Sequence, residues 1–299
     1  MPTPTINPGA SPSDVAIGDR QFRKLCDLVY AHCGINLHDG KQELVRARIA
    51  RLLRARDFRS ANDYLDSVIA DPTGEEFAAL IDALSTNLTS FFRESTHFTF
   101  LADKLLPRIL DRRRKQRDTR IRGWSAACST GEEPYTLGIT LLEALRDAGP
   151  SWDVKILATD ISRNVLKTAV VGRYDATRLA AVAPELRAKY FVPPGASRAA
   201  RAAGGAGGAG GTYQVAPAVR NLVTFNYLNL MDAWPFTGPF DFIFCRNVMI
   251  YFDKQTQQRL VNRFWECLDP GGVLFTGHSE SLTGISHKFQ YVQPTIYMK

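Results

Sequence analysis

Short apolar runs alternate with helical periods from about Ile121 to the end of the chain. Five of the runs are predicted to be strands, and helical periods follow the first, second and fourth. In chain order, the five strands are IRGWSAAC, VKILATD, LVTFNYL, FDFIFCR and GGVLFTG. Parallel strands are joined by crossover helices and covered on both faces, so their sequences are continuously apolar. The pattern predicts an α/β domain built on an open parallel sheet.

The segment before this domain has a different pattern. From Gly18 to about Ser90, apolar residues recur at helical spacing in several stretches, which predicts a small helical domain. We therefore expect three parts: a disordered tail rich in Pro, Ser and Thr (1–17), the helical domain (18–90), and the α/β domain (91–299). The Gly/Ala/Arg-rich stretch 193–211 cannot form a packed core and is expected to be a flexible loop.

Composition argues against several classes of protein. Hydrophobic content of 45% and charged content of 22% are typical of a globular protein, and no apolar run approaches the length that spans a bilayer. The N-terminal MPTPTINPGASPSD lacks the features of a signal peptide, so we expect a cytoplasmic protein without direct membrane insertion. The five cysteines show no metal-ligand pairing and the five histidines no HExxH spacing, so we expect no metal.

The stretch SAACSTGEEPYTLG (125–138) is predicted to be a strand, a small-residue turn and a helix, where nucleotide-binding folds hold a cofactor. Glu132 and Glu133 open that helix. They favour the helix dipole and could simply stabilise the helix, but they would repel the pyrophosphate of a dinucleotide. S-adenosylmethionine carries an ammonium and a sulfonium and no phosphate, so it suits this loop. Asp160 ends the second strand and could accept hydrogen bonds from ribose hydroxyls or cap a turn. Together these features favour S-adenosylmethionine over NAD.

Five separated motifs, in consistent order from about Gly18 to Lys299, resemble the CheR family of chemotaxis receptor glutamate O-methyltransferases. The motifs are STNLTSFFRE, SAACSTGEEPYTLGI, ILATDIS, FDFIFCRNVMIYFD and LFTGHSESL. The resemblance implies a Rossmann-like class I methyltransferase domain with an inserted small antiparallel β-subdomain within about 172–220, preceded by a small all-α domain. It also implies methyl transfer from S-adenosylmethionine to glutamates of methyl-accepting chemotaxis receptors, giving glutamate methyl esters and S-adenosylhomocysteine.

The resemblance implies the site residues as well. Arg93 and Tyr251 would lie nearest to the transferred methyl group and are the candidate catalytic residues. The candidate cofactor-binding residues are Asn87, Thr89, Arg93, Glu132, Glu133, Asp160, Asn229, Leu230, Arg246 and Asn247, with Glu133 favoured over Glu132. Plainer structural roles are open for some of them: Thr89 could cap a helix, Tyr251 could be packing, and Asn247 could form a turn.

Basic residues, which give a net charge of +7, are concentrated in two stretches. We expect the second, Arg112–Arg117, to be a solvated helix face. The first supplies the candidate substrate-binding residues Arg46, Arg48, Arg51 and Arg54. In the family, the receptor helices that carry the methylated glutamates are acidic, so a basic helix would steer them.

The same arginines could bind phosphates, so an RNA methyltransferase is one alternative. Methylation of another protein and a non-catalytic CheR-like binding module are the others. We favour the receptor methyltransferase, acting as a monomer without a nucleic-acid partner. Some family members dock a receptor C-terminal pentapeptide on the β-subdomain. Because the flexible insertion lies in that region here, we expect direct recognition of the methylation helices instead.

Overall fold

The computed structural model describes residues 17–37, 42–56, 58, 60–71, 74–149, 152–193 and 211–299. Nearly all of the expected N-terminal tail and of the expected flexible loop therefore lies outside the described residues. The chain divides into two compact units, Met1–Thr86 and Asn87–Lys299. In the part of the chain that is described, no helix is long and apolar enough to cross a bilayer.

The N-terminal unit is helical, as predicted. Its described helices are α1 (Asp19–Cys33), α2 (Gln42–Ala55), α3 (Ala61–Ala70) and α4 (Glu75–Leu84). Each helix buries one apolar face, as α2 does through Ile49 and Leu53. Local signals set the helix ends: Ser60 caps α3 by accepting a hydrogen bond from the backbone N–H of Asp63, and Gly34 ends α1 in the left-handed conformation.

The C-terminal unit is built on a seven-stranded sheet of order β6-β2-β1-β7-β8-β10-β9. Its strands are β1 (Arg120–Ala126), β2 (Asp153–Asp160), β6 (Val223–Tyr227), β7 (Phe240–Cys245), β8 (Leu268–Thr276), β9 (Gln290–Gln293) and β10 (Ile296–Met298). The first five strands of that order pair in parallel, and β10 pairs antiparallel with both neighbours. The five predicted strands are all present, and the predicted class I methyltransferase fold is confirmed. The terminal pair β9 and β10 was not predicted.

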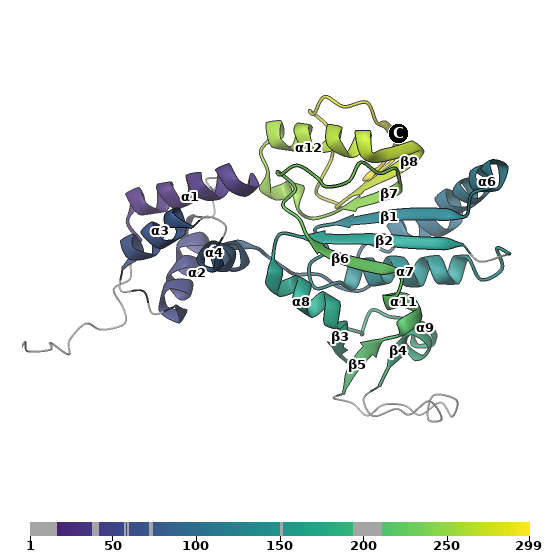
Figure 1. Ribbon diagram of the computed structural model, residues 1–299, viewed down its shortest axis with the longest axis horizontal. Helices are drawn as coiled ribbons and strands as arrows, with labels where there is room; N and C mark the ends of the chain where they lie inside the picture. The colour runs from purple at the N-terminus through teal and green to yellow at the C-terminus, as the bar shows by residue number, and fades with distance from the viewer. Residues whose placement is uncertain are drawn as a thin grey trace, which may run out of the picture. The chain divides into compact units, whose positions relative to one another are not determined.

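Helices cover both faces of the sheet (Figure 1). The main ones are α5 (Thr96–Phe100), the π-helical turn η1 (Leu101–Leu105), α6 (Leu106–Gln116), α7 (Glu132–Ala144), α8 (Arg163–Val171) and α12 (Lys254–Cys267). Ile121 of β1 packs in one cluster with residues of α6 and α7. Trp124 points to the opposite face of the sheet and contacts Phe264 of α12. Alternate residues of β1 therefore pack on opposite faces of the sheet, which explains why consecutive residues from Gly123 to Ala126 are all buried.

A small antiparallel sheet of order β3-β5-β4 confirms the predicted β-subdomain. It consists of β3 (Arg173–Asp175), β4 (Phe191–Val192) and β5 (Thr212–Val215), with the short helices α9 (Pro184–Tyr190) and α11 (Pro217–Arg220) beside them in the chain. Tyr174, Tyr190 and Phe191 bury their rings in a cluster shared with Tyr135 of α7. The subdomain is thus packed on the helix that follows β1.

The expectation of a solvated basic face at the end of α6 is wrong for Arg112 and Arg113. Asp241 at the start of β7 is fully buried, and its Oδ1 accepts hydrogen bonds from Arg112 Nη2 (2.6 Å) and Arg113 Nη2 (2.9 Å). A buried carboxylate must be compensated, so both guanidinium groups turn towards the sheet. Arg114, one residue further on, is exposed as expected.

Gly123 of β1 offers a test of how tightly the central strands pack. It pairs with Phe242 of β7, and a Cβ added at Gly123 would lie 2.2 Å from a ring carbon of Phe242. Gly123→Ala should therefore lower the free energy of unfolding by about 1–3 kcal/mol. All four tryptophans lie in the unit Asn87–Lys299, so tryptophan fluorescence during urea unfolding reports this unit. The cost should shrink in a Phe242→Leu background, and an equal cost in both backgrounds would contradict the steric explanation.

Candidate active site

The candidate site lies where the carboxyl ends of β1, β2 and β7 meet, at the switch in strand order. The loop after β1 leads into α7 through Gly131, which has a φ of 97° and begins the helix. A side chain there would be strained, and its Cβ would lie 2.8 Å from Tyr174 Oη. Glycine therefore allows the sharp entry into α7 that brings Glu132 and Glu133 to the site edge.

Glu132 is completely buried and turned towards the β-subdomain. Its Oε2 accepts a hydrogen bond from Thr130 Oγ1 (2.7 Å), and its Oε1 pairs with Arg178, which follows β3. Tyr174 Oη donates to the carbonyl of Thr130 (2.6 Å). Both carboxylate oxygens of Glu132 thus have partners within the fold, and the residue anchors the loop to the subdomain.

Glu133 occupies a different environment from its neighbour. Its Oε1 accepts a hydrogen bond from Ser125 Oγ (2.7 Å), its Oε2 pairs with Arg246 Nη1 (3.0 Å), and its side chain is 12% exposed. Burial raises the pKa of Glu133 despite the guanidinium. A second cation beside Glu133 would stabilise the charged form of this buried carboxylate.

Arg246, directly after β7, is the buried cation of the site. Its side chain is 2% exposed and pairs with Glu94 Oε2 (2.9 Å) as well as with Glu133. Its Nη2 also donates to the carbonyl oxygen of Arg93 (2.5 Å), and its guanidinium lies 5.6 Å from the ring centre of Phe98. Arg246 therefore joins the end of β7, the start of α7 and the segment around Arg93.

That segment, residues 87–94, lies on the loop after β1. The carbonyl of Asn87 accepts a hydrogen bond from Ser129 Oγ (3.1 Å), and Arg93 donates from Nη1 to the carbonyl of Leu88 (2.8 Å). The side chains of Asn87, Thr89 and Arg93 are half-buried. The candidate residues of this motif thus lie beside the predicted cofactor loop.

Asp160, at the end of β2, contacts the same loop. Its Oδ2 accepts the backbone N–H of Ser129 (2.8 Å) and its Oδ1 that of Ser162 (2.9 Å). The position of Asp160 is therefore compatible both with the predicted cofactor role and with the plainer turn-capping role.

Asn229 and Leu230 follow β6 and are both buried. The side chain of Asn229 is engaged in its own turn, accepting from the backbone N–H of Met231 (3.0 Å) and donating to Asp232 Oδ1 (3.1 Å). The carbonyl of Leu230 accepts a hydrogen bond from Arg263 Nη1 (2.6 Å). This turn holds a fixed shape next to the end of β2.

Asn247 and Tyr251 belong to the loop after β7. Asn247 has a φ of 60°, and Tyr251 ends the short 3₁₀ turn η2 (Met249–Tyr251). Other non-glycine residues of the site segments also have positive φ, namely Phe92, Glu94, Ala127 and Ser129. Such conformations cost free energy and tend to gather at functional sites.

The candidate substrate-binding arginines belong to α2 in the other unit. Arg46 pairs with Asp19 (2.5 Å), and Arg48 donates to the carbonyl of Leu84 (2.7 Å) and to Thr86 Oγ1 (3.1 Å). These two arginines bind their own unit together. Arg51 and Arg54 are exposed.

The sequence did not identify Glu94, Arg178 and Glu280, which contact predicted site residues: Glu94 pairs with Arg246, Arg178 pairs with Glu132, and Glu280 accepts a hydrogen bond from Asn247. Glu94 and Glu280 lie inside the motifs STNLTSFFRE and LFTGHSESL, so an acid in a motif was the available signal. Arg178 lies outside every motif. Its role depends on a contact with Glu132 across 46 positions of sequence, which no local pattern reveals.

Glu94, His97 and His278 form a group whose potential metal-ligating atoms lie within 4.8 Å of one another, among the described residues. The donor set does not suit a divalent cation, because Glu94 Oε2 already pairs with the guanidinium of Arg246. A metal ion on that oxygen would face a buried positive charge. We assign the group no metal.

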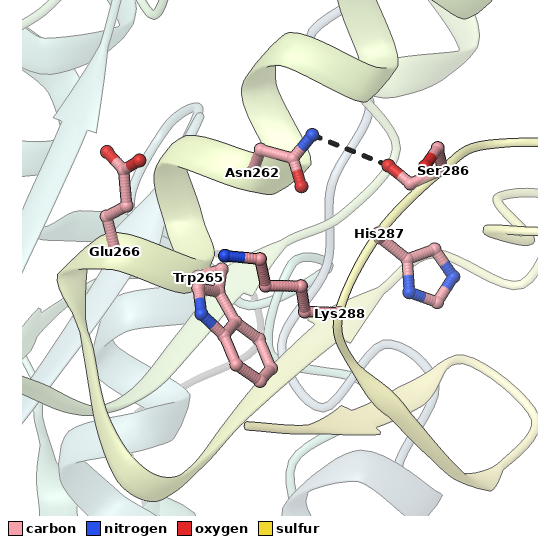
Figure 2. A pocket seen from close by; sticks show the side chains of 6 residues that line it. All are labelled: Asn262, Trp265, Glu266, Ser286, His287 and Lys288. Atoms are coloured by element: carbon pink, nitrogen blue, oxygen red, sulfur yellow. Dashed lines mark hydrogen bonds between the residues drawn. The ribbon is translucent and has the colours of Figure 1, made fainter.

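A pocket of about 290 Å³ lies elsewhere, between the C-terminal half of α12 and the loop before β9 (Figure 2). Its lining residues are Asn262, Trp265, Glu266, Ser286, His287 and Lys288. Glu266 lies in the last turn of α12, just before β8 begins at Leu268. The pocket is therefore at the amino edge of the sheet, opposite the candidate site. It includes none of the predicted site residues.

His97 makes the stability of this unit depend on pH. The ring is 1% exposed and its Nε2 bonds to Thr295 Oγ1 (2.7 Å); burial and the charge of Arg246 lower the pKa of His97 to about 4. Because the pKa of His97 is lower in the folded state than its unfolded value of about 6.5, His97 does not reduce the free energy of unfolding above that pH. Below that pH, the protein should lose up to about 3 kcal/mol of stability as pH falls towards about 4.

Urea unfolding followed by tryptophan fluorescence between pH 4.5 and 8 would measure this loss. His97→Phe keeps a ring at the position but cannot take up a proton, so its free energy of unfolding should vary less over the same range. Equal pH dependence in the two proteins would show that His97 is not responsible.

Known proteins are similar to this chain along nearly its whole length. Residues 20–85 match the family described as CheR methyltransferase, all-alpha domain, and residues 87–298 match CheR methyltransferase, SAM binding domain. The chemotaxis protein methyltransferase of Borreliella burgdorferi is 37% identical over 287 residues, covering 96% of each chain. That of Salmonella typhimurium is 40% identical over 284 residues, covering 95% of this chain and 91% of the relative.

Chemotaxis protein methyltransferase 2 of Pseudomonas aeruginosa is 40% identical over 301 residues, covering 99% of each chain. The resemblance found in the sequence is thereby confirmed, and so is S-adenosylmethionine as the cofactor. The acid-lined strand ends and the two-part architecture accord with these matches. The chain belongs to the CheR methyltransferase family.

Proposed function

We propose that this chain transfers a methyl group from S-adenosylmethionine to glutamate side chains of methyl-accepting chemotaxis receptors, forming glutamate methyl esters and S-adenosylhomocysteine. The observation that carries the proposal is the similarity to chemotaxis protein methyltransferases over 95–99% of the chain. The geometry supports it, because the motif residues gather at one edge of a methyltransferase sheet. We further propose that the protein acts in the cytoplasm, as a monomer and not on nucleic acid.

The site residues fit the chemistry of this cofactor. When bound, S-adenosylmethionine supplies a methyl group attached to a positively charged sulfur. Glu133 would bind the ammonium group, which would satisfy a carboxylate whose pKa burial has raised. Asp160 would bind the ribose hydroxyls from its position at the end of β2. The side chains proposed to complete the binding site are Asn87, Thr89, Arg93 and Asn247, with the turn at Asn229 and Leu230 beside the adenine.

Two predicted cofactor residues receive supporting roles in this proposal. Glu132 has both oxygens engaged with Thr130 and Arg178, so it would hold the loop in shape rather than contact the cofactor. Arg246 pairs with Glu94 and Glu133, so it would act through Glu133. Both are positioning residues.

The acceptor needs no general base. A glutamate side chain has an ordinary pKa of about 4.3 and is an anion near neutral pH. What the chain must provide is alignment of the reacting atoms and exclusion of water. Arg93 is half-buried and would orient the acceptor carboxylate, while Tyr251 would position the reacting oxygen. Neither residue is required to carry a proton.

Within α2, we assign receptor attraction to Arg51 and Arg54. Both are exposed, whereas Arg46 and Arg48 bind groups of their own unit. Exposed arginines facing solvent would raise the rate of encounter with acidic receptor helices, and salt would screen the effect.

The deciding experiment uses S-adenosylmethionine labelled in its methyl group, with receptor cytoplasmic fragments and bulk RNA offered separately. Mild alkali hydrolyses carboxyl methyl esters, so label on a receptor should be released as volatile methanol. Alkali-stable label on protein, or label on RNA, would overturn the proposed acceptor. Cofactor binding without transfer to any of the receptors would favour a non-catalytic binding module.

Glu132 and Glu133 are a natural matched pair for testing the cofactor assignment. Glu133→Gln should weaken the binding of S-adenosylhomocysteine about 10- to 100-fold, because the amide cannot pair with the ammonium. Glu132→Gln should chiefly lower the unfolding temperature, since it removes the buried charge that pairs with Arg178. Titration calorimetry and thermal unfolding measure the two effects. The assignment fails if Glu132→Gln weakens binding more than Glu133→Gln does.

Charge reversal tests the role of α2. Arg51→Glu with Arg54→Glu should raise the KM for a receptor fragment about tenfold at low salt and leave cofactor affinity unchanged, with the difference shrinking as salt increases. Arg20→Glu with Lys24→Glu is the control, because it makes the same charge change at exposed positions of α1. If the control pair raises KM equally, net charge rather than α2 attracts the receptor.

A further inference from the structure

Glu280 is a buried carboxylate that takes no direct part in the proposed methyl transfer. It lies four residues beyond the end of β8, in the motif LFTGHSESL, and is 5% exposed. Removing a carboxylate from water is costly unless hydrogen bonds compensate it. Its partners therefore indicate what the residue does.

The partners are backbone N–H groups from the ends of two strands. Glu280 Oε2 accepts from Gly277 (2.6 Å) and from Asn247 (2.8 Å), and Oε1 accepts from Ile250 (3.2 Å). Asn247 and Ile250 follow β7, whereas Gly277 follows β8. One carboxylate thus ties the loop after β7 to the loop after β8.

The hydrogen bonds are made where the loop needs them. Asn247 holds a positive φ of 60°, which costs free energy unless its surroundings fix it. Ile250 lies in the 3₁₀ turn η2, whose first N–H groups lack partners within the turn, and Glu280 accepts from that end much as a capping side chain does. Tyr251, the candidate catalytic residue, is the last residue of the same turn.

Gly277 limits the loop from the other side. A Cβ at this position would lie 2.6 Å from Asn247 Nδ2 and 2.9 Å from Asn247 N. The loop after β7 therefore sits directly against the backbone of Gly277. The position of Asn247 is fixed both by attraction to Glu280 and by close contact with Gly277.

We infer that Glu280 is a positioning residue for methyl transfer: it holds the turn Asn247–Tyr251 in the conformation that presents Asn247 to the cofactor and Tyr251 to the acceptor carboxylate. The inference rests on the proposed function of that site. Glu280 does not touch the reactants, and it acts through the backbone of the turn.

Glu280→Gln tests the inference with little change of shape. The amide oxygen can replace one carboxylate oxygen, but the NH₂ group then faces a backbone N–H donor, so the turn loses part of its support. Turnover on a receptor fragment should fall at least tenfold, and binding of S-adenosylhomocysteine should weaken several-fold. Thermal unfolding is measured alongside.

Asp241→Asn is the matched control. Asp241 is a buried carboxylate at the opposite end of β7, and its partners Arg112 and Arg113 keep Asp269 as an anionic neighbour. It should lower the unfolding temperature at least as much as Glu280→Gln while leaving turnover and affinity within about twofold. If Asp241→Asn loses as much turnover, general destabilisation explains the loss and the inference is wrong.

Gly277→Ala reaches the same turn without changing a charge, and it decides the matter if Glu280→Gln does not fold. Its added methyl should displace Asn247 and reduce turnover about tenfold. Wild-type kinetics in either folded variant would overturn the inference. Calorimetry with S-adenosylhomocysteine needs no acceptor, so it tests Glu280 even if the wild-type protein proves inactive on receptors, a result that would count against the proposed function alone.

Discussion

The candidate site depends on one buried cation between two carboxylates. Arg246 pairs with Glu94 and with Glu133 and donates to the backbone of Arg93, so three chain segments meet at its guanidinium. Without that charge, two largely buried carboxylates would lie close together without a cation, a situation that typically costs several kcal/mol. The paths of the residues around Arg93 and of the first turn of α7 both follow from this pairing.

Although Glu94 and Glu133 share this cation, their pKa values shift in opposite directions. Burial would raise the pKa of Glu94, but its pairing with Arg246 outweighs burial and the pKa lies below its usual value. Burial prevails at Glu133, whose pKa is raised. Pairing with Arg246 therefore favours the charged form of Glu94, whereas burial disfavours the charged form of Glu133. A bound ammonium would complete the charge balance at Glu133, which gives a physical reason for an acidic helix start.

The fold could be predicted from the sequence because its signals are local. The five predicted strands lie in short apolar runs. The rule that parallel strands present their carboxyl ends together placed Asp160, at the end of β2, and Glu133, after β1, at one edge of the sheet. The buried side of α6 could not be predicted, because Arg113 is drawn inward by Asp241, 128 positions away in the sequence. The terminal pair β9 and β10 was missed because two strands of four and three residues offer little periodicity.

For the site, motifs identified its residues but not their division of labour. Glu132 and Glu133 are equivalent in sequence, and their difference arises from Arg178 on one side and Arg246 on the other. The backbone conformation could not be predicted either, because Phe and Ala rarely adopt the positive φ that Phe92 and Ala127 have here. Pairings across 46 and 113 positions decide what each acid does, and such pairings exist only once the sheet has formed.

A carboxylate acceptor requires positive charge in the protein, but the cofactor edge is acidic. The attraction and the alignment of the acceptor must therefore come from other residues. The cofactor edge carries Glu94, Glu133 and Asp160, which suit an ammonium but would repel an incoming glutamate. Arg246 cannot relieve that repulsion, because it is buried and already paired. Arg93 is half-buried and donates from Nη1 to the carbonyl of Leu88; in the proposed function it orients the acceptor. We therefore propose that exposed arginines such as those of α2 attract the receptor at long range, and that Arg93 and the turn that Glu280 supports align the acceptor at short range.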